Sequence, residues 1–169
     1  KTPIYKYDFD LLRKTLESVK RESANYGFIV HYALKANANF PILKIIKEYG
    51  LGADCVSGNE IDRAVEAGFR GKEIVFAGVG KTDEEIRIAL RNNILCFNCE
   101  SIQEIENINI IAKEEGKTAH IAVRINPDID PGTHPYITTG KFNNKFGIHI
   151  NEKEKLFKTL KECKHIHFE

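Results

Sequence analysis

The sequence predicts an α/β protein built on a parallel sheet. Short apolar runs recur along the chain with helical patterns between them, and the first five runs start 21–25 residues apart. The runs are Phe28–Leu34, Ala53–Val56, Ile74–Ala77, Leu95–Cys99, Ala119–Ile125 and His165–Phe168. Strands that alternate with helices pair in parallel, because each crossover returns the chain to the same edge. Their near-continuous apolar character predicts strands that are buried on both faces.

Sequence signals also place the helices. An opening helix is expected over residues 8–26, where apolar residues recur at helical spacing. Thr82-x-x-Glu85 and Ser101-x-x-Glu104 are predicted capping boxes, in which the hydroxyl and the carboxylate each pair with a backbone N–H. Further helix ends are expected at Gly27, Gly50, Gly68 and Gly116, with a last helix over Glu152–Cys163.

Five strand–helix units and a sixth strand fit either a doubly wound sheet or an incomplete (β/α)8 barrel. The dinucleotide-binding form of the first needs G-x-G-x-x-G after its first strand, and this sequence has none. The segment 78–81, Gly-Val-Gly-Lys, is too short for that loop or for a Walker motif. A complete barrel takes about 250 residues, so a 169-residue chain is about two strands short.

Composition excludes some classes of partner. The net charge is +1, from 25 basic and 24 acidic residues that are spread along the chain. No basic block predicts a nucleic-acid or membrane surface, and no apolar run is long enough to span a membrane. We therefore expect a cytoplasmic protein with reduced cysteines.

Two pairs of potential metal ligands are discounted. Cys96 and Cys99 form a C-x-x-C, but residues three apart on a strand point to opposite faces, so strand packing is expected. His165 and His167 point to one face of the last strand, yet two ligands are too few for a site. No metal is predicted.

In barrel enzymes the chemistry lies at the carboxyl ends of the strands. The residues there are Lys35, Asp54, Ser57, Gly78, Asn98, Arg124 and Asn126. Lys35 ends an apolar run, and partial desolvation would favour its neutral amine, which can form a Schiff base with a carbonyl compound. The alternative is a lysine whose stem packs while its charged head reaches water.

Arg124 and Asp54 each leave two interpretations open. The guanidinium of Arg124 is suited to hold a phosphate, a carboxylate or a phenolate oxygen. Alternatively, it forms a salt bridge with Asp54 or another carboxylate of the barrel. The segment 127–150 follows, rich in proline, glycine and hydrogen-bonding side chains and without a period. Ordered loops of this length are often functional, although this one could simply cover the rim.

Several blocks resemble one family, the barrel-type pyridoxal-phosphate decarboxylases that act on ornithine, arginine and diaminopimelate. The similar blocks are Tyr32–Asn37, which contains Lys35, and then Gly52–Glu60 and Ile74–Lys81. The loop motifs Arg124–Pro127, Thr133–Gly140 and Asn144–Ile148 resemble the diaminopimelate branch.

The resemblance implies a TIM barrel of the alanine-racemase/decarboxylase type. Residues 1–169 would be part of its pyridoxal-phosphate-binding barrel domain, with the remaining strands and a β-rich C-terminal domain outside this chain. It implies pyridoxal 5'-phosphate held as an aldimine on Lys35, with Asp54 and Arg124 lining the cofactor cavity and Glu60 in support. It also implies a homodimer with shared active sites, with Lys145 at the interface.

The activity implied is decarboxylation of meso-2,6-diaminopimelate to L-lysine and carbon dioxide, the last step of lysine biosynthesis. Its partner would be a small amino-acid substrate, and this chain alone is expected to be inactive. Alternatives are a related decarboxylase acting on arginine, ornithine or carboxynorspermidine, a cofactor-free Schiff-base aldolase, or a non-catalytic decarboxylase-like binding protein. The pocket for the substrate side chain would lie beyond Glu169.

Overall fold

The computed structural model describes residues 2–127 and 146–168, and within them it has a six-stranded parallel sheet. The strand order is β1-β2-β3-β4-β5-β8, and every neighbouring pair is parallel. The strands are β1 (His31–Ala33), β2 (Gly52–Cys55), β3 (Ile74–Phe76), β4 (Cys96–Cys99), β5 (Ala119–Val123) and β8 (Ile166–Phe168). This confirms the predicted alternation.

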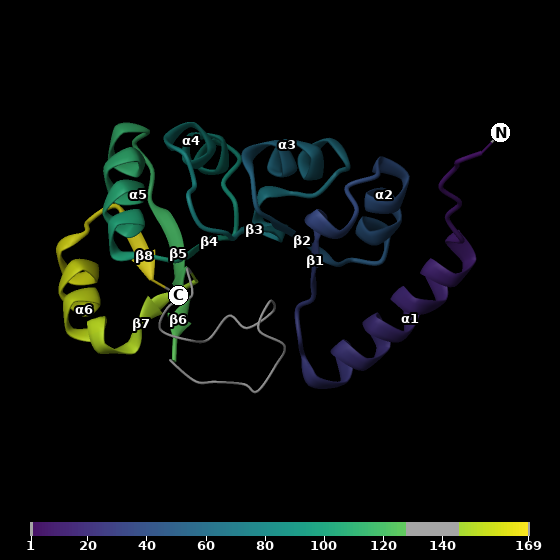
Figure 1. The fold of residues 1–169 in the computed structure, drawn as a ribbon, viewed down its shortest axis with the longest axis horizontal. Helices are drawn as coiled ribbons and strands as arrows, with labels where there is room; N and C mark the ends of the chain where they lie inside the picture. Colours follow the sequence, from purple (N-terminus) through teal and green to yellow (C-terminus); the bar gives the residue numbers. More distant parts are fainter. Residues whose placement is uncertain (1, 128–145, 169) are drawn as a thin grey trace.

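Helices follow the strands in the predicted order. They are α1 (Phe9–Tyr26), α2 (Phe40–Glu48), α3 (Gly58–Glu66), α4 (Asp83–Arg91), α5 (Ile102–Glu114) and α6 (Lys153–Glu162). Figure 1 shows α2, α3, α4 and α5 side by side along one face of the sheet. Among the described residues, no helix has both the length and the apolar character needed to cross a membrane.

The core lies between those helices and the sheet. Ile61, Ile86 and Ile105 from the helices meet Phe76 and Phe97 from the strands, and each is at most 1% exposed. Burial of one such side chain contributes about 1.5–3 kcal/mol. This layer of apolar contacts fixes the positions of the strand ends, where the predicted site residues lie.

The opposite face of the sheet differs from the prediction of burial on both faces. Asp54, Val75 and Asn98 point to this inner face and are only partly buried, while His120 is exposed. Buried and more exposed residues alternate along the strands because the described residues provide a packing layer on the helical side of the sheet alone. The inner face is therefore accessible along the row of strands.

Side-chain caps and a glycine with positive φ explain where several of the helices begin and end. The side chain of Asp8 caps α1, and Gly27 ends it with a φ of 68°. The capping box at Thr82 and Glu85 is confirmed. At α5 the prediction is half right: Ser101 accepts from the Glu104 backbone N–H, but the Glu104 carboxylate is engaged elsewhere.

The first strand is shorter than predicted. β1 pairs with β2 from His31, opposite Gly52, and residues 28–29 lie before this register. Phe28 and Ile29 are accordingly 69% and 80% exposed. After Ala33 the backbone turns into a short 3-10 helix, Leu34–Ala36.

A second, two-stranded parallel sheet was not predicted. It pairs β6 (Ile125–Asn126) with β7 (Ile148–His149), and of the two only β7 lies inside the segment 127–150, where the sequence shows no period. A 3-10 helix, Ile150–Glu152, leads from β7 into α6. The predicted loop residues Thr133, His134, Tyr136, Thr138, Thr139 and Lys145 lie outside the described residues.

Candidate functional site

Lys35, Asp54 and Arg124 lie at the carboxyl ends of β1, β2 and β5, as the sequence predicts. Lys35 is in the 3-10 turn directly after β1, and Asp54 is in β2 opposite Ala33. Arg124 directly follows β5. The side chain of Lys35 is exposed, so its expected partial desolvation is wrong for the described residues. The physical reason is that residues 2–127 and 146–168 provide no packing layer over the inner face beside β1.

Asp54 interacts electrostatically with Lys35. Its carboxyl atom Oδ1 is buried and has no hydrogen-bond partner among the described residues. Burial raises the pKa of the Asp54 carboxyl, and the positive charges of Lys35 and His31 oppose that rise. A buried acceptor without a partner has lost its hydration. Asp54 is therefore suited to meet a hydrogen-bond donor or a cation beside Lys35.

His31, on β1, lies on the same face of the sheet as Asp54. Its ring covers Gly52, where a Cβ atom would overlap the ring and come within 2.7 Å of the Glu73 carbonyl oxygen. Burial lowers the pKa of the His31 imidazole, and the charge of Asp54 opposes this. Gly52 is thus required for the ring to pack beside Asp54.

Glu60 fixes the backbone at the end of β2, while its supporting role at the cofactor cavity stays a prediction. Its Oε2 accepts a 2.7 Å hydrogen bond from the backbone N–H of Val56. Ser57, one of the predicted mouth residues, caps α3 by accepting from the Glu60 N–H at 3.2 Å. These two bonds connect strand and helix immediately after Asp54.

Arg124 forms an ion pair with a carboxylate that the sequence analysis did not single out. Its Nη1 lies 3.2 Å from Oε1 of Glu100, whose side chain is only 3% exposed while that of Arg124 is 45% exposed. The guanidinium also lies over the Phe146 ring, 4.8 Å from the centroid. Arg124 is therefore in a salt bridge with a carboxylate of the barrel, and that carboxylate is Glu100 rather than Asp54. The Arg124 side chain is still 45% exposed, and its role in holding an anionic group stays a prediction.

A second buried ion pair stands beside this one. Lys81, 1% exposed, donates to Glu104 at 2.6 Å and to the carbonyl oxygens of Gly78 and Asn98 at 2.8 and 2.9 Å. The other oxygen of Glu104 accepts from the Glu100 backbone N–H at 2.9 Å. Gly78 and Asn98, predicted at the mouth, thus contribute their backbone to a fixed network.

The remaining candidates have structural roles. Asn126 is 4% exposed and lies in β6. All four cysteines are free, and burial raises the pKa of the Cys55 and Cys99 thiols. Across residues 2–127 and 146–168, no group of three or more potential ligands is placed to hold a metal ion.

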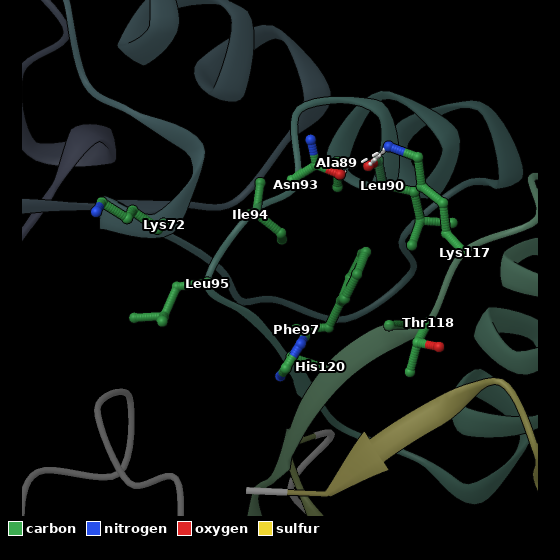
Figure 2. A pocket seen from close by; sticks show the side chains of 11 residues that line it. Lys72, Ala89, Leu90, Asn93, Ile94, Leu95, Phe97, Lys117, Thr118 and His120 are labelled. Carbon is green, nitrogen blue, oxygen red and sulfur yellow. Dashed lines mark hydrogen bonds between the residues drawn. The ribbon is translucent and has the colours of Figure 1, made fainter.

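A hollow of about 430 Å³ lies at the other end of the strands. Figure 2 shows Phe97 and Ile94 pointing into it, with Lys117 at one side bonded to the backbone of Leu90. Its lining comes from the end of α4, from residues that precede β3, β4 and β5, and from the first half of β4 and β5. The amino ends of barrel strands serve stability, so this hollow is not the candidate active site.

The geometry defines a class of protein: a parallel α/β barrel-type domain that presents an amine, a carboxylate and a guanidinium at the carboxyl ends of its strands. Residues 10–168 match the family described as pyridoxal-dependent decarboxylase, pyridoxal binding domain. The chain belongs to this family and holds part of its barrel, and pyridoxal phosphate is the family's cofactor.

Relatives agree with this assignment. The chain is 51% identical over 168 residues to diaminopimelate decarboxylase of Bacteroides thetaiotaomicron, covering 99% of this chain and 44% of that protein. A mutant of the Helicobacter pylori diaminopimelate decarboxylase, in complex with L-lysine, superposes with a TM-score of 0.91 at 44% identity, covering 99% of this chain and 43% of that one. The M. jannaschii diaminopimelate decarboxylase, also in complex with L-lysine, superposes with a TM-score of 0.79 at 42% identity, covering 93% of this chain and 38% of that one. The chain thus spans less than half the length of these relatives.

Proposed function

We propose that the intact protein containing this chain decarboxylates meso-2,6-diaminopimelate to L-lysine and carbon dioxide with pyridoxal phosphate. The observation that carries the proposal is the 51% identity to a diaminopimelate decarboxylase over 99% of the chain, which includes Lys35, Asp54 and Arg124. The likeness to two diaminopimelate decarboxylases in complex with L-lysine supports the substrate class.

The residues present fit the cofactor. Lys35 offers an exposed primary amine, the group that condenses with an aldehyde. Asp54 has a buried oxygen without a partner among the described residues, and this suits a donor or a cationic ring atom. Arg124 offers a guanidinium for an anionic oxygen. Lys35 would hold the cofactor, with Asp54 and Arg124 lining its cavity.

The division of work follows from these groups. When bound, pyridoxal phosphate supplies a conjugated ring that accepts the electron pair released as carbon dioxide leaves. Lys35, once its amine is free, is placed to accept and return a proton at Nζ. Asp54 balances the positive charge beside it, and Arg124 orients an anionic group through its fixed N–H geometry. Each of these roles depends on the exact placement of the side chain, because a reacting group must be held in line with its partner.

The test is carbon dioxide release by the intact, cofactor-loaded protein from meso-diaminopimelate, with ornithine and arginine in parallel. Release from meso-diaminopimelate alone is expected. Release from ornithine or arginine instead would keep the chemistry and replace the substrate. No release from any of them would favour a non-catalytic binding protein. A preparation that retains pyridoxal phosphate excludes the cofactor-free aldolase.

Lys35→Ala should remove the covalent attachment of the cofactor and lower turnover by at least about 10³-fold, because the variant has no amine there. The measurements are pyridoxal phosphate retained after gel filtration and the turnover number. Lys155→Ala, an exposed lysine on α6, is the matched control and should behave as wild type. Unchanged turnover in Lys35→Ala would contradict the proposal.

The homodimer, the cytoplasmic location and the β-rich second domain stay predictions.

A further inference from the structure

We propose that Glu100 is the positioning residue that holds the guanidinium of Arg124 toward the cofactor. This inference rests on the proposed function, since it concerns how the cavity binds pyridoxal phosphate. Glu100 directly follows β4, one strand away from Arg124 at the end of β5.

The carboxylate of Glu100 uses both of its oxygen atoms. Oε1 accepts from Nη1 of Arg124 at 3.2 Å, and Oε2 accepts from the backbone N–H of Gly147 at 2.8 Å. The partners lie 24 and 47 residues away in sequence. A single buried carboxylate thus joins the end of β5 to the start of β7.

The surroundings leave little freedom to this arrangement. The backbone N–H of Arg124 donates to Cys99 at 2.9 Å, and its carbonyl oxygen accepts from Ile148 at 2.8 Å. Gly147 has a φ of +80°, and a Cβ there would come within 3.0 Å of the Arg124 carbonyl oxygen. The backbone on either side of the ion pair is therefore fixed, so the Glu100 carboxylate determines the direction of the guanidinium.

Burial makes the charge of Glu100 costly without a partner. Its side chain is 3% exposed, and a buried carboxylate is stable only when it is paired and hydrogen-bonded. The Arg124 side chain pairs with this buried anion and is itself 45% exposed. The ring of Phe146 covers the guanidinium at 4.8 Å. An arginine held in this way loses less freedom when it binds an anionic group.

The neighbouring ion pair holds Glu100 itself. Glu104 accepts from the Glu100 backbone N–H, and Lys81 fixes Glu104 with a 2.6 Å bond. Neither Lys81 nor Glu104 forms a hydrogen bond or an ion pair with Arg124. Their role is to fix the backbone on which Glu100 stands.

The experiment is a double-mutant cycle on the affinity of the intact apo-protein for pyridoxal phosphate. Glu100→Gln keeps the shape of the side chain and an acceptor for Gly147 but removes the charge that orients Arg124. We expect it to weaken pyridoxal phosphate binding about tenfold, the size of one charge-assisted hydrogen bond. In an Arg124→Ala background the same change should cost less than about twofold, because the group being positioned is gone.

Controls separate positioning from stability. Glu115→Gln breaks a comparable pairing with Arg87 and Arg91 between α4 and α5, and it should leave the affinity unchanged. Thermal melting checks the fold of every variant. If Arg124→Ala does not fold, Arg124→Met replaces it in the cycle, because it keeps a long apolar stem and removes the guanidinium that Glu100 positions.

Four outcomes overturn the inference. Affinity within twofold of wild type in Glu100→Gln, or an equal loss in both backgrounds, would reduce Glu100 to a structural role. Unchanged affinity in Arg124→Ala would remove the group that Glu100 is said to position. If wild type still releases carbon dioxide from meso-diaminopimelate, these results leave the proposed function in place. Failure of wild type to bind pyridoxal phosphate would overturn both.

Discussion

Glu73 shows how a single side chain connects separate elements of this fold. It ends a short 3-10 helix, Gly71–Glu73, just before β3. Its Oε2 lies 2.7 Å from Nζ of Lys47 on α2 and accepts from the Arg70 backbone N–H at 2.8 Å. The hydrogen bond from the Arg70 guanidinium, aided by Lys47, lowers the pKa of Glu73 to about 2, although burial opposes this.

This predicts a pH-dependent contribution to stability. The folded-state pKa of Glu73 lies below its ordinary value of 4.5, so the contribution is present above pH 4.5 and is lost as the pH falls toward 2. After solvent screening it is about 1–2 kcal/mol. Glu73→Gln should lower the free energy of unfolding of the intact protein by that amount at pH 7 and by less at pH 3. Denaturant titration at both values measures it.

The control for Glu73 is Glu48→Gln. Glu48 pairs with Arg13 on the surface, with side chains 60% and 44% exposed, and exposed pairs contribute little. We expect a change below about 0.5 kcal/mol at either pH. An equal loss at pH 7 and pH 3 for Glu73→Gln would show that the carboxylate charge is not the cause.

At the residue scale, the local sequence predicts some residues of the site but not others. Lys35 and Asp54 were found because each ends or lies in a buried strand, and strand ends follow from the apolar period. Glu100 also follows a buried strand, but the sequence prediction names Asn98 as the residue at the end of that strand. The two partners of Glu100, Arg124 and Gly147, lie 24 and 47 residues away, so only the tertiary structure brings them together.

At the scale of elements, the start of α4 is the best-defined junction. Thr82 caps the helix, and the Glu85 carboxylate accepts from the Thr82 backbone N–H and from the Gly58 N–H, both at 3.0 Å. Gly58 begins α3, so the capping box of α4 also fixes the start of the preceding helix. The capping signal was readable in the sequence, whereas the bond to α3 depends on the packing of two helices.

Thr82→Ala should lower the free energy of unfolding by about 1 kcal/mol, because the backbone N–H of Glu85 loses its acceptor. Chemical denaturation of the intact protein measures the change. Thr118→Ala, an exposed position before β5, is the matched control and should lie within about 0.5 kcal/mol of wild type. A loss as small as that of the control would show that the cap contributes nothing to α4.

At the scale of the whole molecule, the sheet has one covered face and one accessible face. In the described part of the chain, β1 and β8 are its edges, and α2, α3, α4 and α5 lie along one face (Figure 1). Exposed apolar side chains near the first edge include Tyr26, Phe28 and Ile29. Unpaired strand edges and exposed apolar surface favour association with other chains.

A polypeptide of these 169 residues alone is therefore expected to self-associate and to bind pyridoxal phosphate at least about tenfold more weakly than the intact protein. Sedimentation velocity and a cofactor titration measure this, with the intact protein as the reference. A monomeric polypeptide that binds the cofactor as tightly as the intact protein would contradict the expectation.

The sequence by itself determined the order of strands and helices, the parallel pairing and the positions of Lys35, Asp54 and Arg124 at strand ends. These features depend on local periodicity and on the short-range signals that begin and end helices. Only the tertiary structure decided that Arg124 pairs with Glu100 and that β7 lies beside β6. Those contacts join residues that are distant in the chain, and they depend on strand register and on a close approach of backbone that Gly147 allows.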